Sequence, residues 1–343
     1  MPLPTPRTRE RRSDFISRCM GNPQSVKDFP DQSQRGGVCA SQWDRRRRNR
    51  RWDRVRYRTL IHRNDPTNTG GIIRAYIADF NRRWRKIIDL IVETVVVNNA
   101  LHLGEPLSDI FELVAAQAAG PFQFRQDAGK VEDFNNWLSN LLDDDVLEVR
   151  RSSTGRVTNN SKWQDTFVRS AYSRGLNHAE QALRSQGIPF DSRTVSDLFN
   201  APLHRGALEL LYTRQFTDLQ GITTEVSDQI SRVLTEGLAT GQGPLDMART
   251  MRKRIEVIGM TRSKVLARTE IIRVHAESTL NRYQDAGVDQ VTVFAEFVTA
   301  GDDRVCQTCQ DLETGEAIAL NEARGVIPVH ANCRCAWLPV LPD

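Results

Sequence analysis

Two short stretches near the carboxyl end decide how the fold of this chain is interpreted: Asp303-Arg304-Val305-Cys306-Gln307-Thr308-Cys309 and Val329-His330-Ala331-Asn332-Cys333-Arg334-Cys335. The first contains a C-x2-C pair, and the second has the spacing H-x2-C-x-C. Zinc in proteins favours four tetrahedral sulfur or nitrogen ligands, usually delivered as close pairs from two turns. These stretches supply such pairs with one ligand to spare, so they predict a small module folded around one metal ion.

The candidate ligands of this ion are Cys306, Cys309, His330, Cys333 and Cys335. The preferred set is Cys306, Cys309, His330 and Cys333, with Cys335 as the competing fourth ligand. When protein side chains fill all four positions, no position remains for an activated water, so the predicted zinc ion is structural. The sequence therefore predicts a zinc knuckle rather than a catalytic metal centre.

Two alternatives to a metal site remain open at this point. The cysteines could be buried thiols or a disulfide in a short two-stranded unit. They could also belong to a thiol-dependent hydrolase, since a Cys/His pair suits nucleophilic catalysis. Two close pairs suit chelation better than a lone nucleophile does. The zinc deaminase pattern is not matched either, because there the histidine comes first and a glutamate follows two residues later.

The overall composition favours a helical protein with extended parts. The chain has 343 residues, enough for two or three cores, and only six cysteines, too few for a disulfide scaffold. The longest apolar stretch, 87–97, is interrupted by Asp89 and Glu93, so it is too short and too polar for a membrane span. The amino terminus lacks the apolar centre of a secretory signal. We therefore expect a protein that folds and acts in a cytoplasm, or in something assembled there, with no membrane partner.

Positive charge is concentrated in one segment of the chain. Residues 44–58 contain nine arginines and two aspartates, a net charge of +7, whereas the whole chain carries +4. Guanidinium groups bind phosphate, and interleaved aromatic rings can stack on bases. The segment therefore predicts non-specific binding to DNA, or alternatively docking on an acidic protein surface, and a plain solvated tail is the remaining alternative. Its candidate binding residues are Arg45, Arg46, Arg47, Arg48, Arg50, Arg51, Trp52, Arg54, Arg56, Tyr57 and Arg58.

The pattern of apolar residues divides the chain into three predicted parts. Residues 1–70 read as an extended basic arm that includes a small cysteine and aromatic motif between Cys19 and Trp43. Residues 71–218 show apolar positions every three or four residues and predict a helical body. Residues 219–343 predict a mixed module with helices over 226–239, 246–257 and 261–286, then strands over 290–298 and 336–340 that pair with each other. The expected fold class is mainly α with a small α+β C-terminal module and an extended arm.

Residues 219–339 resemble the phage minor head protein family, the Mu F-like head morphogenesis proteins. The resemblance rests on the helix around Ile230–Gly237, on Thr261-Arg262-Ser263-Lys264-Val265-Leu266-Ala267-Arg268-Thr269-Glu270, and on the two cysteine stretches quoted above. It implies a minor capsid component at the portal vertex, needed for head assembly and DNA packaging. The implied partners are the portal protein, the major capsid or scaffold protein, DNA and further copies of the chain, and no catalysis is implied.

Two rival hypotheses accompany this interpretation. One is a zinc-containing nucleic-acid-binding protein whose main binding element is the basic arm. The other is a hydrolase or effector that uses the Cys/His cluster. The charged residues of the Ala-Arg-Thr-Glu run have their own alternatives, because Arg268, Glu270, Arg273 and Glu277 are spaced for ion pairs on one helix. They form either a solvated salt-bridged face or a buried polar anchor that ties this helix to the C-terminal module.

Overall fold

The computed structural model describes residues 16–19, 21, 65–102, 129–151, 157–158, 162–188, 190–287 and 293–340. The chain divides into two compact units. The first contains residues 1–70, 171–207 and 272–343, and the second contains 71–170 and 208–271. The basic segment 44–58 lies outside the described residues. The predicted three-part division of the chain is not tested by these units and stays a prediction.

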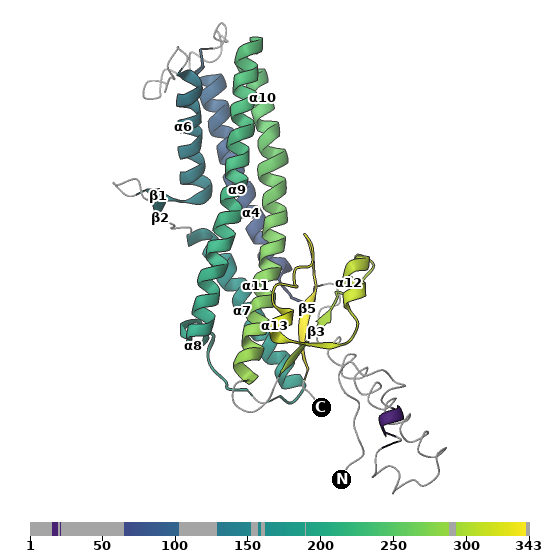
Figure 1. Ribbon diagram of the computed structural model, residues 1–343. Coiled ribbons are helices and arrows are strands. Elements are labelled where there is room, and N and C mark those ends of the chain that lie inside the picture. Colours follow the sequence, from purple (N-terminus) through teal and green to yellow (C-terminus); the bar gives the residue numbers. More distant parts are fainter. Residues whose placement is uncertain are drawn as a thin grey trace. The chain divides into compact units, whose positions relative to one another are not determined.

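The second unit is a set of helices that run alongside one another (Figure 1). Some of these helices carry a π-helical turn at one end, and α7, α9 and α11 also contribute residues to the first unit. The elements are α4 Gly70–Val92, η1 Glu93–Val97, α6 Lys130–Leu142, η2 Asp143–Leu147, β1 Arg150–Arg151, β2 Val157–Thr158, α7 Lys162–Ser185, α9 Pro202–Thr240, α10 Pro244–Arg254, η3 Ile255–Met260 and α11 Thr261–Gly287.

Aromatic side chains form the centre of this second unit. The rings of Tyr76 and Phe80, one turn apart on α4, stack with centroids 4.6 Å apart, and Tyr76 also stacks on Phe167 of α7 at 4.5 Å. Trp163 meets Phe80 edge to face. The buried Tyr76 hydroxyl accepts a hydrogen bond from Gln215 of α9. Burial of large rings that contact one another stabilises the packing of α4, α7 and α9.

Helix α9 is longer than the sequence predicted. The apolar pattern indicated a helix over 226–239, whereas the helix begins at Pro202 and ends at Thr240. Its buried positions recur at helical spacing through Leu208, Leu211, Leu219 and Ile222, but Gln215 occupies the middle of this stripe. Because Gln215 interrupts this stripe of apolar residues, their spacing did not predict a helix in the first half of α9. Gln215 is accommodated in the core because it donates to Tyr76.

Helices α10 and α11 are joined without a break, contrary to the predicted interruption between 257 and 261. The π-helical turn η3 connects them. Gly259 in this turn lies against the ring of Trp84, and a Cβ there would come within 2.8 Å of it. The indole Nε1–H of Trp84 donates to Ser263 Oγ at 2.9 Å. The glycine therefore permits close packing on α4 rather than ending the helix, and π turns of this kind interrupt otherwise regular helices.

The first unit contains the small sheet that the sequence predicted. Strand β3 Phe294–Val298 pairs antiparallel with β5 Ala336–Val340, in the register Ala295 opposite Pro339 and Phe297 opposite Trp337. A third strand, β4 Ala317–Ala319, pairs with the other edge of β3 and was not predicted. Short helices α8 Val195–Asn200, α12 Gln307–Leu312 and α13 Leu320–Ala323 complete the unit, with α13 beside the sheet (Figure 1). The expected class, mainly α with a small α+β C-terminal module, is confirmed, and the sheet of this module is antiparallel.

Helices α7 and α11 cross closely in this unit. Gly175 faces α11, where a Cβ would lie 2.5 Å from the His275 carbonyl oxygen, and Thr279 Oγ1 donates to the Gly175 carbonyl at 3.3 Å. Next to this crossing the sheet packs on α7 through a buried cluster of Ala182, Val298, Ala336 and Leu338. The sheet, whose strands β3 and β5 flank the cysteine stretches in sequence, is thus anchored on α7.

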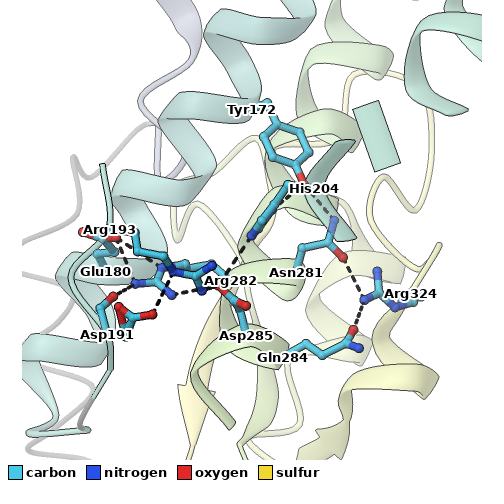
Figure 2. A network of polar contacts seen from close by, with 10 residues as sticks. All are labelled: Tyr172, Glu180, Asp191, Arg193, His204, Asn281, Arg282, Gln284, Asp285 and Arg324. Carbon is cyan, nitrogen blue, oxygen red and sulfur yellow. Dashed lines mark hydrogen bonds and ion pairs between the residues drawn. The ribbon is translucent and has the colours of Figure 1, made fainter. Parts of the chain in front are cut away.

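A buried polar network also fixes the ends of the helices in the first unit (Figure 2). Arg282 of α11 is fully buried, and its guanidinium contacts Glu180 at 3.2 Å, Asp285 at 3.1 Å and the Asp191 carbonyl. A second branch runs from Asn281 through the Tyr172 hydroxyl to His204, with distances of 2.9 and 2.8 Å. Arg324 joins the network through Asn281, Gln284 and Glu277. Because a buried charge needs partners, we interpret the network as a structural tie.

Two buried histidines make the stability of this unit sensitive to acid. His178 Nε2–H donates to the Trp337 carbonyl at 3.4 Å, and its ring lies edge-on to that of His275. Burial lowers the pKa of His178 to about 4. Burial also lowers the pKa of His275 well below its usual value, and repulsion from His178 and Arg174 adds to this effect. In the unfolded chain a histidine has a pKa of about 6.5. The unfolded state therefore binds more protons below that pH, and stability falls as the pH drops from about 6.5 towards 4.

We expect His178→Gln to remove part of this acid sensitivity. For His178 alone the loss of unfolding free energy between pH 7.5 and pH 5 is about 2 kcal/mol. The measurement is urea denaturation of both proteins at the two pH values, with His102→Gln as a matched control outside this core. Equal losses for the wild type and His178→Gln would contradict the assignment.

Candidate metal centre

The first cysteine pair sits at the start of α12. Cys306 is the residue before the helix, and its carbonyl accepts from the Gln310 N–H at 3.0 Å. Cys309 follows in the first helical turn and is buried. Since residues three apart on a helical turn lie on the same face, both sulfur atoms point to one side. The C-x2-C pair therefore has the local geometry that chelation requires.

The second group of ligands comes from a tight turn that leads into β5. The Cys333 N–H donates to the His330 carbonyl at 3.1 Å, and Asn332 adopts a left-handed conformation with φ of 64°. Asparagine tolerates this conformation better than most residues do. Cys335 lies directly before Ala336, the first residue of β5. The pairing of β5 with β3 thus places Cys333 and Cys335 at one end of the sheet.

The fold brings all five predicted ligands into one cluster. His330 Nε2 lies 3.2 Å from Cys306 Sγ and 3.2 Å from Cys309 Sγ. The donor atoms of Cys306, Cys309 and His330 all lie within 4.8 Å of one another, and so do those of Cys309, Cys333 and Cys335. Cys309 belongs to both groups. Donors from the start of α12 and from the turn before β5, which are far apart in sequence, therefore lie together in the fold.

The orientation of His330 suits a metal ligand. Its Nδ1–H donates to the Ala331 carbonyl at 2.7 Å, which leaves the Nε2 lone pair facing the two sulfurs. Histidines that bind metals commonly use one ring nitrogen for the ion and the other for a backbone carbonyl, which fixes the tautomer. The imidazole is therefore held ready to bind a cation through Nε2.

The thiols differ in how readily they ionise. Burial raises the pKa of Cys309 to about 12, whereas a hydrogen bond from the Cys335 thiol lowers the pKa of Cys333 to about 5. The Cys309 N–H lowers the pKa of Cys306, and donation of the Cys335 thiol to Cys333 raises the pKa of Cys335. Several sulfurs in one place cannot all ionise unless a cation joins them. Binding of a metal ion by these thiols would therefore release protons.

These donors fit zinc. Bond lengths of about 2.3 Å to sulfur and about 2.0 Å to nitrogen place the ligand atoms of one ion about 3.5–3.8 Å apart. The contacts at 3.2 Å and the groups within 4.8 Å bracket this spacing. Thiolate and imidazole together suit zinc better than calcium or magnesium, which prefer oxygen ligands. When bound, the ion would join α12 to the turn before β5, and Cys306, Cys309, His330, Cys333 and Cys335 are the residues available to hold it.

An ion pair ties the two cysteine turns together. Arg334 donates to both oxygens of Asp302, at 2.7 and 2.6 Å. Side chains alternate along an extended segment, so Arg334 points away from the sulfurs of its neighbours Cys333 and Cys335. Hydrogen bonds from Arg334 hold the pKa of Asp302 well below its usual range. No role for Arg334 could be predicted from the sequence, because its spacing does not indicate a distant partner.

We expect Arg334→Gln to weaken zinc binding by about tenfold or more, since partners that orient metal ligands commonly contribute 10- to 100-fold in affinity. Arg304→Gln is the matched control. Arg304 also contacts Asp302, at 2.9 Å, but it is exposed and lies only two residues away, so its loss is expected to change affinity little. Zinc affinity is measured by competition with a chromophoric chelator. Equal affinities for the two variants would show that the bridge does not support the site.

The eleven arm residues between Arg45 and Arg58 lie outside the described residues. Cys19 is buried in a short helical segment at 16–19. Glu270 of the Ala-Arg-Thr-Glu run is buried, and its carboxylate lies 3.6 Å from Arg214 of α9, whereas Arg268 is exposed. Glu270 is thus buried and contacts α9, whereas Glu277 of the same helix accepts hydrogen bonds from Arg324 and from the Gly325 N–H of the C-terminal module.

Comparison with known proteins gives one match. Residues 228–338 match the model of the family described as Phage Mu protein F like protein. This range runs from the end of α9 through the joined helices to β5, and it includes all five candidate metal ligands. No curated protein and no solved structure matches the chain. Within the described residues, none of the helices has the length and apolar character needed to cross a membrane.

Proposed function

From the Phage Mu protein F-like domain at residues 228–338, we propose that the protein is a minor head protein of a tailed bacteriophage. The family is one of phage head morphogenesis and minor head proteins, which are generally structural rather than enzymatic. In this proposal the protein is present in few copies at the portal vertex of the virion head and assists head assembly and DNA packaging. The observation that carries the proposal is the family match over the domain that contains the Cys/His cluster.

The Cys/His cluster supports a structural role for this domain. Three of its cysteines are buried, and the metal they suit would be surrounded by protein ligands. A zinc ion with four protein ligands clamps a fold and has no open position for a reacting water. The proposed function of the ion is therefore to hold α12 and the turn before β5 together in a particle that must survive outside the cell.

The role proposed for the basic segment 44–58 is contact with packaged DNA. Its net charge of +7 comes from arginines, which bind phosphate with two parallel hydrogen bonds. The alternative partner is an acidic surface of the portal, capsid or scaffold protein. Both partners are present where a portal-associated head protein would lie, and further copies of the chain would be close by.

The head assignment is tested in the phage that encodes this chain. We propose a nonsense mutation in its gene, with the wild-type protein supplied from a plasmid as the control. The expected result is that purified heads contain the protein only in the complemented infection, and that DNA-filled heads become rare without it. Normal yields of filled heads together with absence of the protein from wild-type virions would refute the proposal and favour a zinc-containing nucleic-acid-binding protein.

The arm is tested by deleting residues 44–58. If all seven net charges meet phosphate, the logarithm of the DNA affinity falls with the logarithm of salt concentration with a slope of about −6. We expect the deletion to abolish retention on DNA while co-purification with the portal protein persists. Loss of portal binding together with unchanged DNA binding would show that the arm docks on protein instead.

A further inference from the structure

The cluster offers more donors than one zinc ion uses. Five side chains provide ligand atoms, whereas structural zinc is almost always four-coordinate. The donors form two overlapping groups that share Cys309. Among the described residues, each group has three members whose donor atoms all lie within 4.8 Å of one another. One donor is therefore left without the ion, and the differences between the two groups indicate which donors can be left out.

The groups differ in burial and in freedom to move. Cys309, Cys333 and Cys335 are 2%, 2% and 3% exposed, so packing holds their sulfurs in place. Cys306 is partly accessible and His330 is exposed. A side chain at the surface can change its rotamer, which moves its end atoms by about an ångström or more, at little cost in free energy. A buried side chain cannot, because close-packed neighbours fill the space around it. The three buried sulfurs form an inner set, and the other two donors lie at its outer edge.

The two outer donors compete for one place. Cys306 Sγ and His330 Nε2 are 3.2 Å apart, and both lie beside Cys309. His330 is oriented by its own hydrogen bond to the Ala331 carbonyl, independently of Cys306. Cys306 is placed by the start of α12, independently of His330. Each outer donor is thus positioned without the other, and each lies where the fourth ligand of the inner set would approach.

We propose that Cys309, Cys333 and Cys335 are permanent ligands of the zinc ion and that Cys306 and His330 are interchangeable fourth ligands. This inference rests on the proposed zinc site. It requires that either outer donor can be lost while zinc is retained, and that any inner donor cannot.

The test uses the full chain with Cys306→Ser, His330→Ala and the double variant. Each protein is purified with zinc, dialysed against a chelator and analysed for bound metal. We expect one zinc per chain in both single variants and none in the double variant. Cys333→Ser and Cys335→Ser are each expected to lose the ion. The matched control is Thr308→Ala, at an exposed position between Cys306 and Cys309, and this variant is expected to retain the ion.

Cobalt substitution gives a second readout that does not depend on stability. Sulfur-to-cobalt charge transfer grows with the number of bound thiolates. Four thiolates are available to the ion in His330→Ala, but only three in Cys306→Ser. We therefore expect the charge-transfer band per cobalt to be about a quarter weaker in Cys306→Ser than in His330→Ala. Identical bands would overturn the proposal.

The possible failures can be told apart. If the wild-type protein binds no zinc, the proposed metal site itself is wrong. If the wild type binds zinc but either outer single variant loses it, or an inner variant keeps it, only the interchange is refuted. Neither result bears on the head assignment, which is decided by the presence of the protein in virions.

Discussion

Cys309→Ser is expected to unfold the C-terminal module and abolish metal binding. Cys309 is the one donor common to both groups of the cluster, and it is buried. Without it neither group retains three donors, and the protein loses a zinc-binding free energy that reaches roughly 10–16 kcal/mol in small zinc domains. The free energy of unfolding of a protein is a small difference between large opposing terms. A loss of this size therefore exceeds what the remaining interactions of the sheet can offset.

Hydrogen exchange localises this effect. Amides of β3 and β5 are expected to exchange rapidly in Cys309→Ser, while those of α4 and of α9 beyond Leu208 keep their protection. Treatment of the wild type with a chelator should reproduce the pattern, and added zinc should reverse it. Thr308→Ala again serves as the control on the same helix. Protection of β3 and β5 that survives both treatments would mean that the sheet does not depend on a metal ion.

Gly175→Ala is expected to destabilise the first unit by about 3 kcal/mol, at the upper end of the range for overpacked positions. A Cβ at this position would meet Ser278 Oγ at 1.8 Å and the His275 carbonyl oxygen at 2.5 Å. The serine side chain can rotate away, but the carbonyl belongs to the backbone of α11. The two helices must therefore move apart, which disturbs the buried neighbours of the crossing.

Chemical denaturation measures this loss, and two further variants sharpen it. Gly206→Ala is the matched control, because no atom lies within 4 Å of a Cβ there. It is expected to stabilise helix α9 by about 0.5–1 kcal/mol. The double variant Gly175→Ala/Ser278→Ala removes only the side-chain clash and should remain destabilised. Full recovery in that variant would show that the backbone contact is not the cause.

The sequence predicted those parts of the fold that depend on local patterns. Apolar residues at helical spacing predicted the helical body that contains α4, α6 and α7, and β-branched and aromatic residues predicted that β3 and β5 pair. Strand β4 escaped because Ala317-Ile318-Ala319 is too short to show alternation. The first half of α9 and the junction at η3 escaped because Gln215 and Gly259 fit only through contacts with Tyr76 and Trp84, which are distant in sequence.

The same distinction holds for the metal centre. The spacing of the cysteines and the histidine predicted that they would meet, because a chelating turn is encoded within a few residues. The division into inner and outer donors was not predicted, since burial depends on the packing of β5 and α12. The partner of Arg334 was not predicted either, because an ion pair between residues 302 and 334 leaves no periodic trace in the sequence. Likewise, the sequence did not decide between an exposed and a buried Glu270, because its partner Arg214 lies on α9, far away in sequence.

The π turn η3 also constrains how this helix can change in length. Such a turn accommodates one residue more than an α-helical turn does. Removing a single residue from 255–260 would restore regular winding and leave the later side chains close to their present directions, because a π turn spreads one more residue over about the same rotation. Ala267 and Ile271, now buried, would still face the core they fill. The two halves of this long helix thus keep the same phase with or without the extra residue, so a deletion of one residue should be tolerated here better than in the regular part of α11, where it would rotate all later side chains by about 100°.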